Sequence, residues 1–169
     1  MRTALTGTPG TGKTTVAALL PYRVIDINAL VKEGLNLGID PERGCLNADM
    51  DALARCLEEM DPGKTSILEG HFSHCFADWS IVLRLAPFEL RKRLEARGYS
   101  QEKIRENLEA EALDVTLVEA VELCSRVDEI DTTGKTPQEV ARLVMRIVEG
   151  ELELPPGQVD WLIDFFGSE

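Results

Sequence analysis

Short apolar segments alternate with amphipathic ones along most of the chain. The segments 2–6, 22–27, 65–69, 80–85 and 127–131 are rich in apolar and β-branched residues and predict strands. Stretches with helical periodicity separate them. Strands that alternate with helices over short connections are typical of a parallel sheet covered by helices on both faces. The pattern therefore predicts an α/β fold with a five-stranded parallel sheet flanked by helices.

Capping residues and prolines mark the ends of the predicted helices. Helices are predicted over 13–20, 29–33, 49–60 or 51–60, 87–97 and 137–149. Asp26 or Asn28 can cap the second of these. A further helix begins after Ser100, and its apolar positions recur every three or four residues at Ile104, Leu108, Ala112, Val115 and Val118. That spacing predicts one continuous helix with a single buried stripe.

Two stretches depart from this alternation. The stretch 34–49, GLNLGIDPERGCLNAD, has three glycines and one proline, which predicts a mobile loop. After Gly150, an acidic link with two prolines leads to an apolar segment at 159–166. We therefore expect one domain over 1–150 and a tail over 151–169 that docks on it. The alternative for the tail is a helix whose apolar face is free for a partner.

The composition is ordinary for a soluble globular protein, with 44% hydrophobic and 28% charged residues among 169. No apolar run is long enough to span a bilayer, and the first residues contain no signal-type cleavage site, so we expect a cytoplasmic protein without a membrane partner. The formal net charge is −12. This charge argues against direct binding of nucleic acid and favours a basic partner protein, although it also serves simple solubility.

The four cysteines occur at positions 45, 56, 75 and 124 without a C-x-x-C pair. This spacing does not predict a zinc ribbon or a redox motif, so we expect reduced cysteines that act as small apolar residues. His71, His74 and Cys75 lie close enough in sequence to share a metal ion. Without a second group of ligands, that alternative is the weaker one.

The strongest chemical signal is the stretch Gly7–Thr14, GTPGTGKT, which matches G-x-x-x-x-G-K-[ST] in full. It lies between the first predicted strand and the first predicted helix, as a phosphate-binding loop does. Gly10 and Gly12 let the backbone curl so that successive N–H groups point at a phosphate. The free N–H groups at the start of the following helix face the same anion.

Three side chains that follow the glycines predict the ligand. Lys13 can reach the β- and γ-phosphates, the Thr14 hydroxyl can ligate Mg²⁺, and Thr15 can contact the α-phosphate. This set predicts binding of Mg²⁺ with ATP or GTP. The chain contains no N-K-x-D guanine-reading motif, which favours ATP.

The length and the single sheet resemble those of the small nucleoside monophosphate kinases. The resemblance implies an acceptor-binding segment at about 28–51 and an arginine-bearing lid at about 96–106. Arg93 and Arg97 lie four residues apart on one face of a predicted helix. Arginine suits phosphoryl transfer because its planar fork pairs with phosphate oxygens. The alternative is that both arginines are solvated partners of nearby glutamates.

Four motifs carry a closer resemblance: GTPGTGKTT, EGH after the third strand, RLEARGYSQEKIREN, and EIDTTGKTPQEV. Over about residues 1–149 they resemble the adenylate kinase isoenzyme 6 family, also called the coilin-interacting nuclear ATPase family, and in particular its archaeal members. The resemblance implies adenylate kinase and ATPase activities and a role in maturation of the small ribosomal subunit, through a small-subunit ribosomal protein.

The same resemblance assigns further site residues. The family motif D-x-H-G falls on Glu69-Gly70-His71, so Glu69 would hold the Mg²⁺ water shell, and His71 would order the attacking water or contact the acceptor phosphate. Glutamate stands here where the family motif has aspartate, a difference that bears on the hydrolytic mechanism more than on nucleotide binding. The lid arginine on the ATP side falls on Arg97, and Arg43 is the candidate for the acceptor phosphate.

We therefore expect a nucleoside monophosphate kinase that converts ATP and AMP to two ADP, with ATPase activity and possible breadth of acceptor. A dedicated ribosome-assembly ATPase with little kinase activity is the alternative. A small-metabolite kinase similar to shikimate kinase is more distant, since the third strand of those enzymes leads into a glycine-rich acceptor loop. Here that strand leads into EGHFSH.

Overall fold

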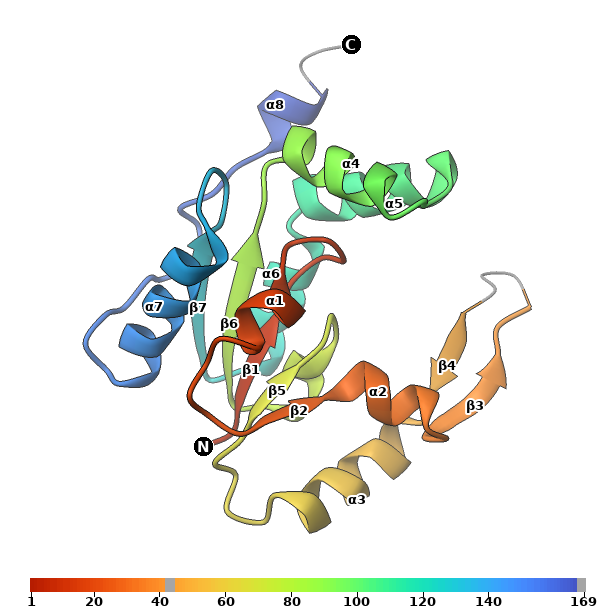
Figure 1. Cartoon of the computed structure of the whole chain (residues 1–169), viewed down its shortest axis with the longest axis vertical. Coiled ribbons are helices and arrows are strands. Elements are labelled where there is room, and N and C mark those ends of the chain that lie inside the picture. The colour runs from red at the N-terminus through yellow and green to blue at the C-terminus, as the bar shows by residue number, and fades with distance from the viewer. Residues whose placement is uncertain (42–44, 167–169) are drawn as a thin grey trace.

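The computed structural model describes residues 1–41 and 45–166, and its centre is the predicted five-stranded sheet (Figure 1). The sheet order is β2-β5-β1-β6-β7, and every neighbouring pair is parallel. The strands are β1 (Thr3–Thr6), β2 (Val24–Asp26), β5 (Ile67–Glu69), β6 (Trp79–Arg84) and β7 (Arg126–Asp131). The predicted α/β fold is confirmed, and β1 lies in the middle of the sheet.

The connections between the strands are mainly helical. The helices are α1 (Lys13–Ala17), α2 (Ile27–Lys32), α3 (Met50–Met60), the 3₁₀ turn η1 (Ser73–Phe76), α4 (Pro87–Ala96), α5 (Gln101–Ala112), α6 (Val115–Leu123), α7 (Pro137–Val148) and α8 (Leu162–Phe166). Asp26 caps α2 by accepting from the Ala29 N–H at 3.0 Å. Thr136 and Glu139 form a capping box at α7. Among the described residues, no helix has the length and apolar character that crossing a membrane requires.

Each face of the sheet packs against its own helices. On one face, Leu5 and Ile81 pack with Val144 in a cluster that α1 and α7 close. On the other face, α2 and α3 cover β5 around Leu68, and α6 covers β6 around Val82. The alternation of side chains along each strand puts apolar residues on both faces, as burial on both sides requires.

The stretch 34–49, predicted as a loop, contains a β-hairpin instead. Strands β3 (Asn36–Ile39) and β4 (Leu46–Ala48) pair antiparallel, apart from the main sheet. Leu37 and Ile39 alternate with other residues, but Gly38 between them, at a φ of 100°, hid the strand pattern. The two side chains are 74% and 70% exposed, so no core burial stabilises the hairpin through them.

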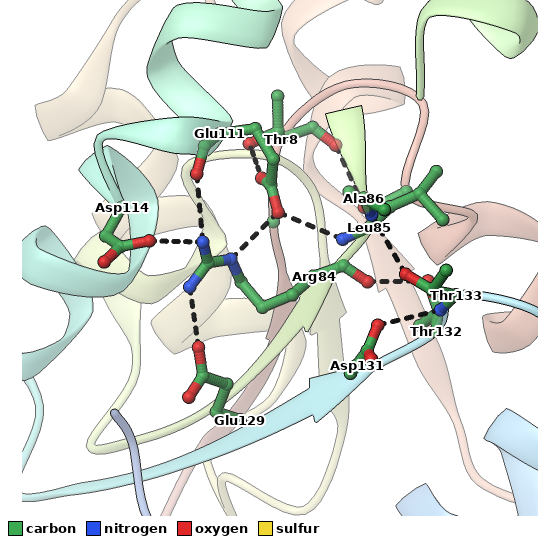
Figure 2. Close-up of polar contacts among 12 residues, drawn as sticks. Thr8, Arg84, Leu85, Ala86, Glu111, Asp114, Glu129, Asp131, Thr132 and Thr133 are labelled. Atoms are coloured by element: carbon green, nitrogen blue, oxygen red, sulfur yellow. Dashed lines mark hydrogen bonds and ion pairs between the residues drawn. The ribbon is translucent and has the colours of Figure 1, made fainter. Parts of the chain in front are cut away.

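The single helix predicted from residue 100 past residue 118 is also wrong, because the chain breaks between α5 and α6. Asp114 has a φ of 57°, which is left-handed. The guanidinium of Arg84 donates to the Glu111 carbonyl at 2.9 Å and to the Asp114 carboxylate (Figure 2). The Glu111 carbonyl would accept from the residue 115 N–H in a continuous helix, so the buried arginine takes its place. Val118 then lies 50% exposed on α6.

The tail runs along β7, the strand at one edge of the sheet. The Glu129 N–H donates to the Leu154 carbonyl at 2.7 Å, and the Leu154 N–H donates to the Asp128 carboxylate at 2.7 Å. Farther along, Phe165 of α8 packs against the apolar cluster between α4 and α5 (Figure 1). The tail therefore covers an edge that would otherwise present unpaired backbone groups.

Candidate functional site

The phosphate-binding loop joins β1 to α1 at the carboxyl end of the central strand, and two of its glycines are needed for close packing. A Cβ on Gly7, at a φ of 141°, would lie 2.4 Å from the Leu83 carbonyl oxygen. A Cβ on Gly10, at a φ of 100°, would lie 2.7 Å from a methyl group of Leu90. The loop is thus pressed between the end of β6 and helix α4, which fixes its shape.

Lys13 is buried at the start of α1. Its Nζ donates to the carbonyls of Gly7 and Thr8, at 2.7 and 3.0 Å. Burial lowers the pKa of Lys13 to about 8, although the charges of Glu69 and Glu111 oppose the shift. An anion in the loop would favour the charged ammonium. A bound phosphate would therefore raise the pKa of Lys13 again.

Thr14 and Glu69 meet where α1 begins and β5 ends. The Thr14 hydroxyl donates to Oε1 of Glu69 at 3.2 Å. Burial raises the pKa of Glu69, and so does the charge of Asp26, which is opposite Glu69 in the β2–β5 register. Hydroxyl and carboxylate oxygens are the ligands that Mg²⁺ prefers, and a cation would relieve the repulsion between the two carboxylates. These residues therefore fit a Mg²⁺ ion.

Asp26 is a site residue that sequence reasoning treated only as a helix cap. Its neighbour Glu69 is more than forty residues away in the chain, and only the pairing of β2 with β5 brings the two carboxylates together. The carboxyl ends of adjacent parallel strands meet at one edge of the sheet. The strand order needed for this argument is not visible in a single sequence.

His71 follows β5 at the carboxyl end of that strand and is exposed. Partial desolvation of the ring, followed by the positive charges of Lys13 and His74, lowers the pKa of His71 to about 4. The imidazole is therefore neutral at neutral pH. His71 lies within electrostatic range of the phosphate-binding lysine.

His74 has a different environment from His71, because it is buried under the sheet. Its Nδ1 lies 3.1 Å from the Thr6 hydroxyl, and its Nε2 lies 3.3 Å from a carboxylate oxygen of Glu119. Cys75 is exposed. Within residues 1–41 and 45–166, no group of three or more histidine, cysteine or acidic residues is arranged to hold a metal ion. The histidine–cysteine metal site considered above therefore has no geometric support.

A cavity of about 270 Å³ opens beside the loop. Its lining comes from the loop and α1, from α4 and the residue after it, and from the connection after β7 and the first turn of α7: Thr11, Gly12, Thr15, Val16, Arg93, Arg97, Thr132, Lys135, Pro137 and Val140. Arg93 donates to the Gly10 carbonyl at 3.4 Å and lies 3.9 Å from the Glu89 carboxylate. The mixture of apolar walls and cationic groups suits the nucleoside part of a nucleotide.

A wider hollow of about 650 Å³ lies at the opposite ends of the strands, near Arg2 and Asp78. It contains no residue of the phosphate-binding loop. Size alone would favour this hollow, but the phosphate-binding loop borders the smaller cavity. We therefore place the functional site at the loop.

The structure brings most of the expected site residues together. Lys13, Thr14 and Glu69 are in contact or in electrostatic range, and Arg97 and Thr15 line the adjacent cavity. Arg43, the candidate for the acceptor phosphate, lies outside the described residues. Sequence reasoning missed the contribution of the connection after β7, because only the strand order places it beside α1.

A phosphate-binding loop after the central strand of a five-stranded parallel sheet defines the P-loop kinase-like fold. A family model described as "AAA domain" matches residues 4–114. A protein named "Putative adenylate kinase" from Methanosarcina barkeri is 49% identical, over 96% of this chain and 98% of the relative. One of the same name from Methanothermobacter thermautotrophicus is 50% identical, over 94% and 98%. The chain belongs to this family of archaeal AAA-domain proteins.

Solved structures share the fold at low sequence identity. Shikimate kinase from Acinetobacter baumannii has a TM-score of 0.53 at 18% identity and covers 88% of this chain and 93% of its own. Thymidylate kinase from Candida albicans has a TM-score of 0.53 at 15% identity, with coverage of 88% and 90%. At these identities the likeness concerns the fold alone.

Proposed function

We propose that this protein is a nucleoside monophosphate kinase that transfers the γ-phosphate of Mg·ATP to AMP and gives two ADP. The observation that carries the proposal is the meeting of Lys13, Thr14 and Glu69 beside the loop. Gly12 and Thr15, on either side of Lys13 and Thr14 in the chain, line a cavity with Arg93 and Arg97 in its wall. The name of the archaeal relatives supports a nucleotide substrate. The alignment with those relatives extends over nearly the whole chain, so their shared name is relevant to all of the site.

In this proposal the loop N–H groups and Lys13 bind the β- and γ-phosphates, and Lys13 leaves the carbonyls that it now contacts. Thr14 and Glu69 would hold Mg²⁺, with Glu69 acting through water. When bound, the ion neutralises charge on the phosphates. An oxygen of the AMP phosphate bonds to the γ-phosphorus while the bond to the β–γ bridging oxygen breaks. Arg97 stabilises the charge that spreads over the transferred group.

Two segments flank the site and would enclose the substrates. The α4–α5 connection carries Arg97 of the predicted lid. Gly98 within it has a φ of 73° in open space, where an added Cβ would meet no atom within 4 Å. The β3–β4 hairpin lies in the predicted acceptor-binding segment, and its exposed Leu37 and Ile39 supply apolar surface for an acceptor base. Enclosure would exclude water, whose attack would hydrolyse ATP instead.

The experiment that tests the kinase is an acceptor screen. Protein and Mg·ATP are mixed with each nucleoside monophosphate in turn and with none, and nucleotides are separated by chromatography. We expect AMP to give two ADP for each ATP consumed, and Lys13→Ala to abolish the reaction. Lys64→Ala, at an exposed turn away from the site, is the matched control and should remain active. If AMP neither accelerates ATP consumption nor becomes ADP, the kinase proposal is wrong.

We infer a second candidate function, ATP hydrolysis in assembly of the small ribosomal subunit, from the resemblance of the EGH and RGYSQEKIREN motifs. One structural observation favours a basic protein partner. Helix α6 exposes an apolar face made of Val115, Val118 and Val121, and no lysine or arginine occurs between residues 113 and 125. The acidic residues beside that face would repel a second copy and attract a basic surface.

This second function is tested by the no-acceptor arm of the same screen and by capture of a purified basic small-subunit ribosomal protein. His71→Ala should lower acceptor-free hydrolysis. Val118→Lys with Val121→Lys should weaken capture and leave the AMP reaction unchanged, because α6 does not line the site. A pull-down that stays empty with and without nucleotide would remove this candidate.

A further inference from the structure

A buried ionic cluster lies beside the phosphate-binding loop and belongs to none of the roles given above. It consists of Arg84, at the end of β6, with Glu111, Asp114 and Glu129 (Figure 2). Arg84 is 1% exposed, and its Nε and Nη1 lie 2.9 and 2.6 Å from Glu111 and Glu129. Burial would lower the pKa of Arg84, but the carboxylates of Glu111 and Asp114 raise it. The guanidinium therefore stays charged.

Glu111 is the member of the cluster that reaches the loop. Its Oε1 accepts from Arg84 Nε at 2.9 Å and from the Leu85 N–H at 3.0 Å. Its Oε2 accepts from the Thr8 hydroxyl (Figure 2). Both oxygens are therefore engaged, one by the end of β6 and the other by the loop. A hydrogen bond to a buried carboxylate is stronger than one between neutral groups.

Thr8 in turn supplies the carbonyl that several other groups of the loop contact. It is 1% exposed, and its carbonyl accepts from Lys13 Nζ at 3.0 Å and from the Thr11 hydroxyl at 2.9 Å. The Thr11 N–H donates to the same carbonyl at 3.3 Å. The direction of this carbonyl depends on how Thr8 is held, and the side chain of Thr8 is held by Glu111.

Glu111 also lies in the last turn of α5, the helix that begins just after the lid arginine Arg97. The residue whose carboxylate touches the loop therefore lies at the end of the helix that leads from the lid. Arg84 fixes this end of α5 from the other side, through the Glu111 carbonyl and the Asp114 carboxylate.

We propose that Glu111 is a positioning residue for the donor triphosphate, which it serves by holding Thr8 and by fixing the lid helix against the phosphate-binding loop. The proposal rests on the proposed function in one respect, that the loop binds Mg·ATP. A loop held in its anion-binding shape before the ligand arrives loses less conformational freedom on binding. In this proposal Glu111 acts through Thr8 and through α5, and not by contact with the substrate.

The test removes the contact without removing the cluster. Thr8→Val keeps the shape of the side chain and leaves Glu111 paired with Arg84, whereas Thr8→Ser restores the hydroxyl. Thr3→Val, at the start of β1, removes the hydroxyl of a buried residue away from the loop and is the matched control. Dissociation constants for Mg·ATP are measured by calorimetry, KM values for ATP and AMP by steady-state kinetics, and Tm by thermal unfolding.

For Thr8→Val we expect Kd and KM for Mg·ATP to rise about tenfold, the scale of one charge-assisted hydrogen bond, while KM for AMP stays unchanged. Thr8→Ser should recover most of the affinity, and Thr3→Val should bind as the unmodified protein does. Unchanged ATP affinity in Thr8→Val, no recovery in Thr8→Ser, or equal losses for ATP and AMP would each overturn the proposal. If the unmodified protein itself binds no Mg·ATP, the proposed function fails instead.

Discussion

At the scale of single residues, the protonation of Lys13 in the free protein affects how the loop binds its ligand. The ammonium is buried against two backbone carbonyls, and its pKa is lowered to about 8. A bound triphosphate supplies several negative charges and would raise that pKa again. Binding of nucleotide and binding of a proton are therefore linked at this position.

We predict that Mg·ATP binding takes up about half a proton near pH 8, because Lys13 is about half deprotonated there and becomes fully charged in the complex. The binding enthalpy should differ between Tris and HEPES buffers, whose enthalpies of ionisation differ. At about pH 6.5 the lysine is already charged, so the two buffers should agree. Equal enthalpies in both buffers at the higher pH would contradict a lowered pKa for Lys13.

At the scale of elements, the sequence predicted strands and caps well, and it failed where distant residues decide the local structure. The helix cap at Ser100 was visible in the chain, and its side chain accepts from the Lys103 N–H. The end of α5 was not visible, because it is set by Arg84, nearly thirty residues earlier in the chain. Nothing in the local sequence EALDVTLVE contains glycine or proline to announce a break.

The residues of the candidate site also fall into those that the sequence could predict and those that it could not. Lys13 and Thr14 could be identified because the loop motif is contiguous and has its own physical rationale. Asp26 and Thr132 could not, since each enters the site through strand order: β2 lies beside β5, and β7 beside β6. Propensity and periodicity describe neighbours in sequence, whereas these contacts depend on which strands become neighbours in space.

The break between α5 and α6 gives a prediction about Asp114. Asp114→Gly and Asp114→Ala both lose the contact with Arg84, but only alanine must adopt a left-handed conformation with a Cβ. We expect Asp114→Gly to be more stable than Asp114→Ala by about 1 kcal/mol, measured by urea unfolding. If alanine were the more stable, α5 and α6 would be merging into one helix in the variant.

At the scale of the whole molecule, the tail joins parts that are far apart in the chain. The carboxylate of Glu129 accepts from the N–H groups of Gly157 and Gln158 at 2.8 and 2.9 Å, and it also pairs with Arg84. Leu152 and Leu154 pack against the core cluster under α7. The tail is thus connected to the buried cluster on one side and to the core on the other.

We predict that removal of residues 151–169 lowers the free energy of unfolding by about 3 kcal/mol, since several hydrogen bonds and partly buried leucines are lost. For a chain of this size, Tm would fall by about 6–12 °C. The uncovered edge of β7 should also promote association, which light scattering would detect. Ile163→Ala, at a side chain 79% exposed, should leave both properties unchanged. A shortened protein of undiminished Tm would show that the tail contributes no stability.

The anchoring of α5 at one end has a mechanical consequence. A helix of twelve residues is about 18 Å long and resists bending, so it acts as a lever. Its pivot is the turn that contains Glu111, and its other end, which packs against α4 through Ile104, lies near the lid arginine. A tilt of about 10° at the pivot would carry the tip through about 3 Å, as far as a hydrogen bond is long. A small movement of the loop around a phosphate would therefore produce a larger displacement of the end of α5 near Arg97.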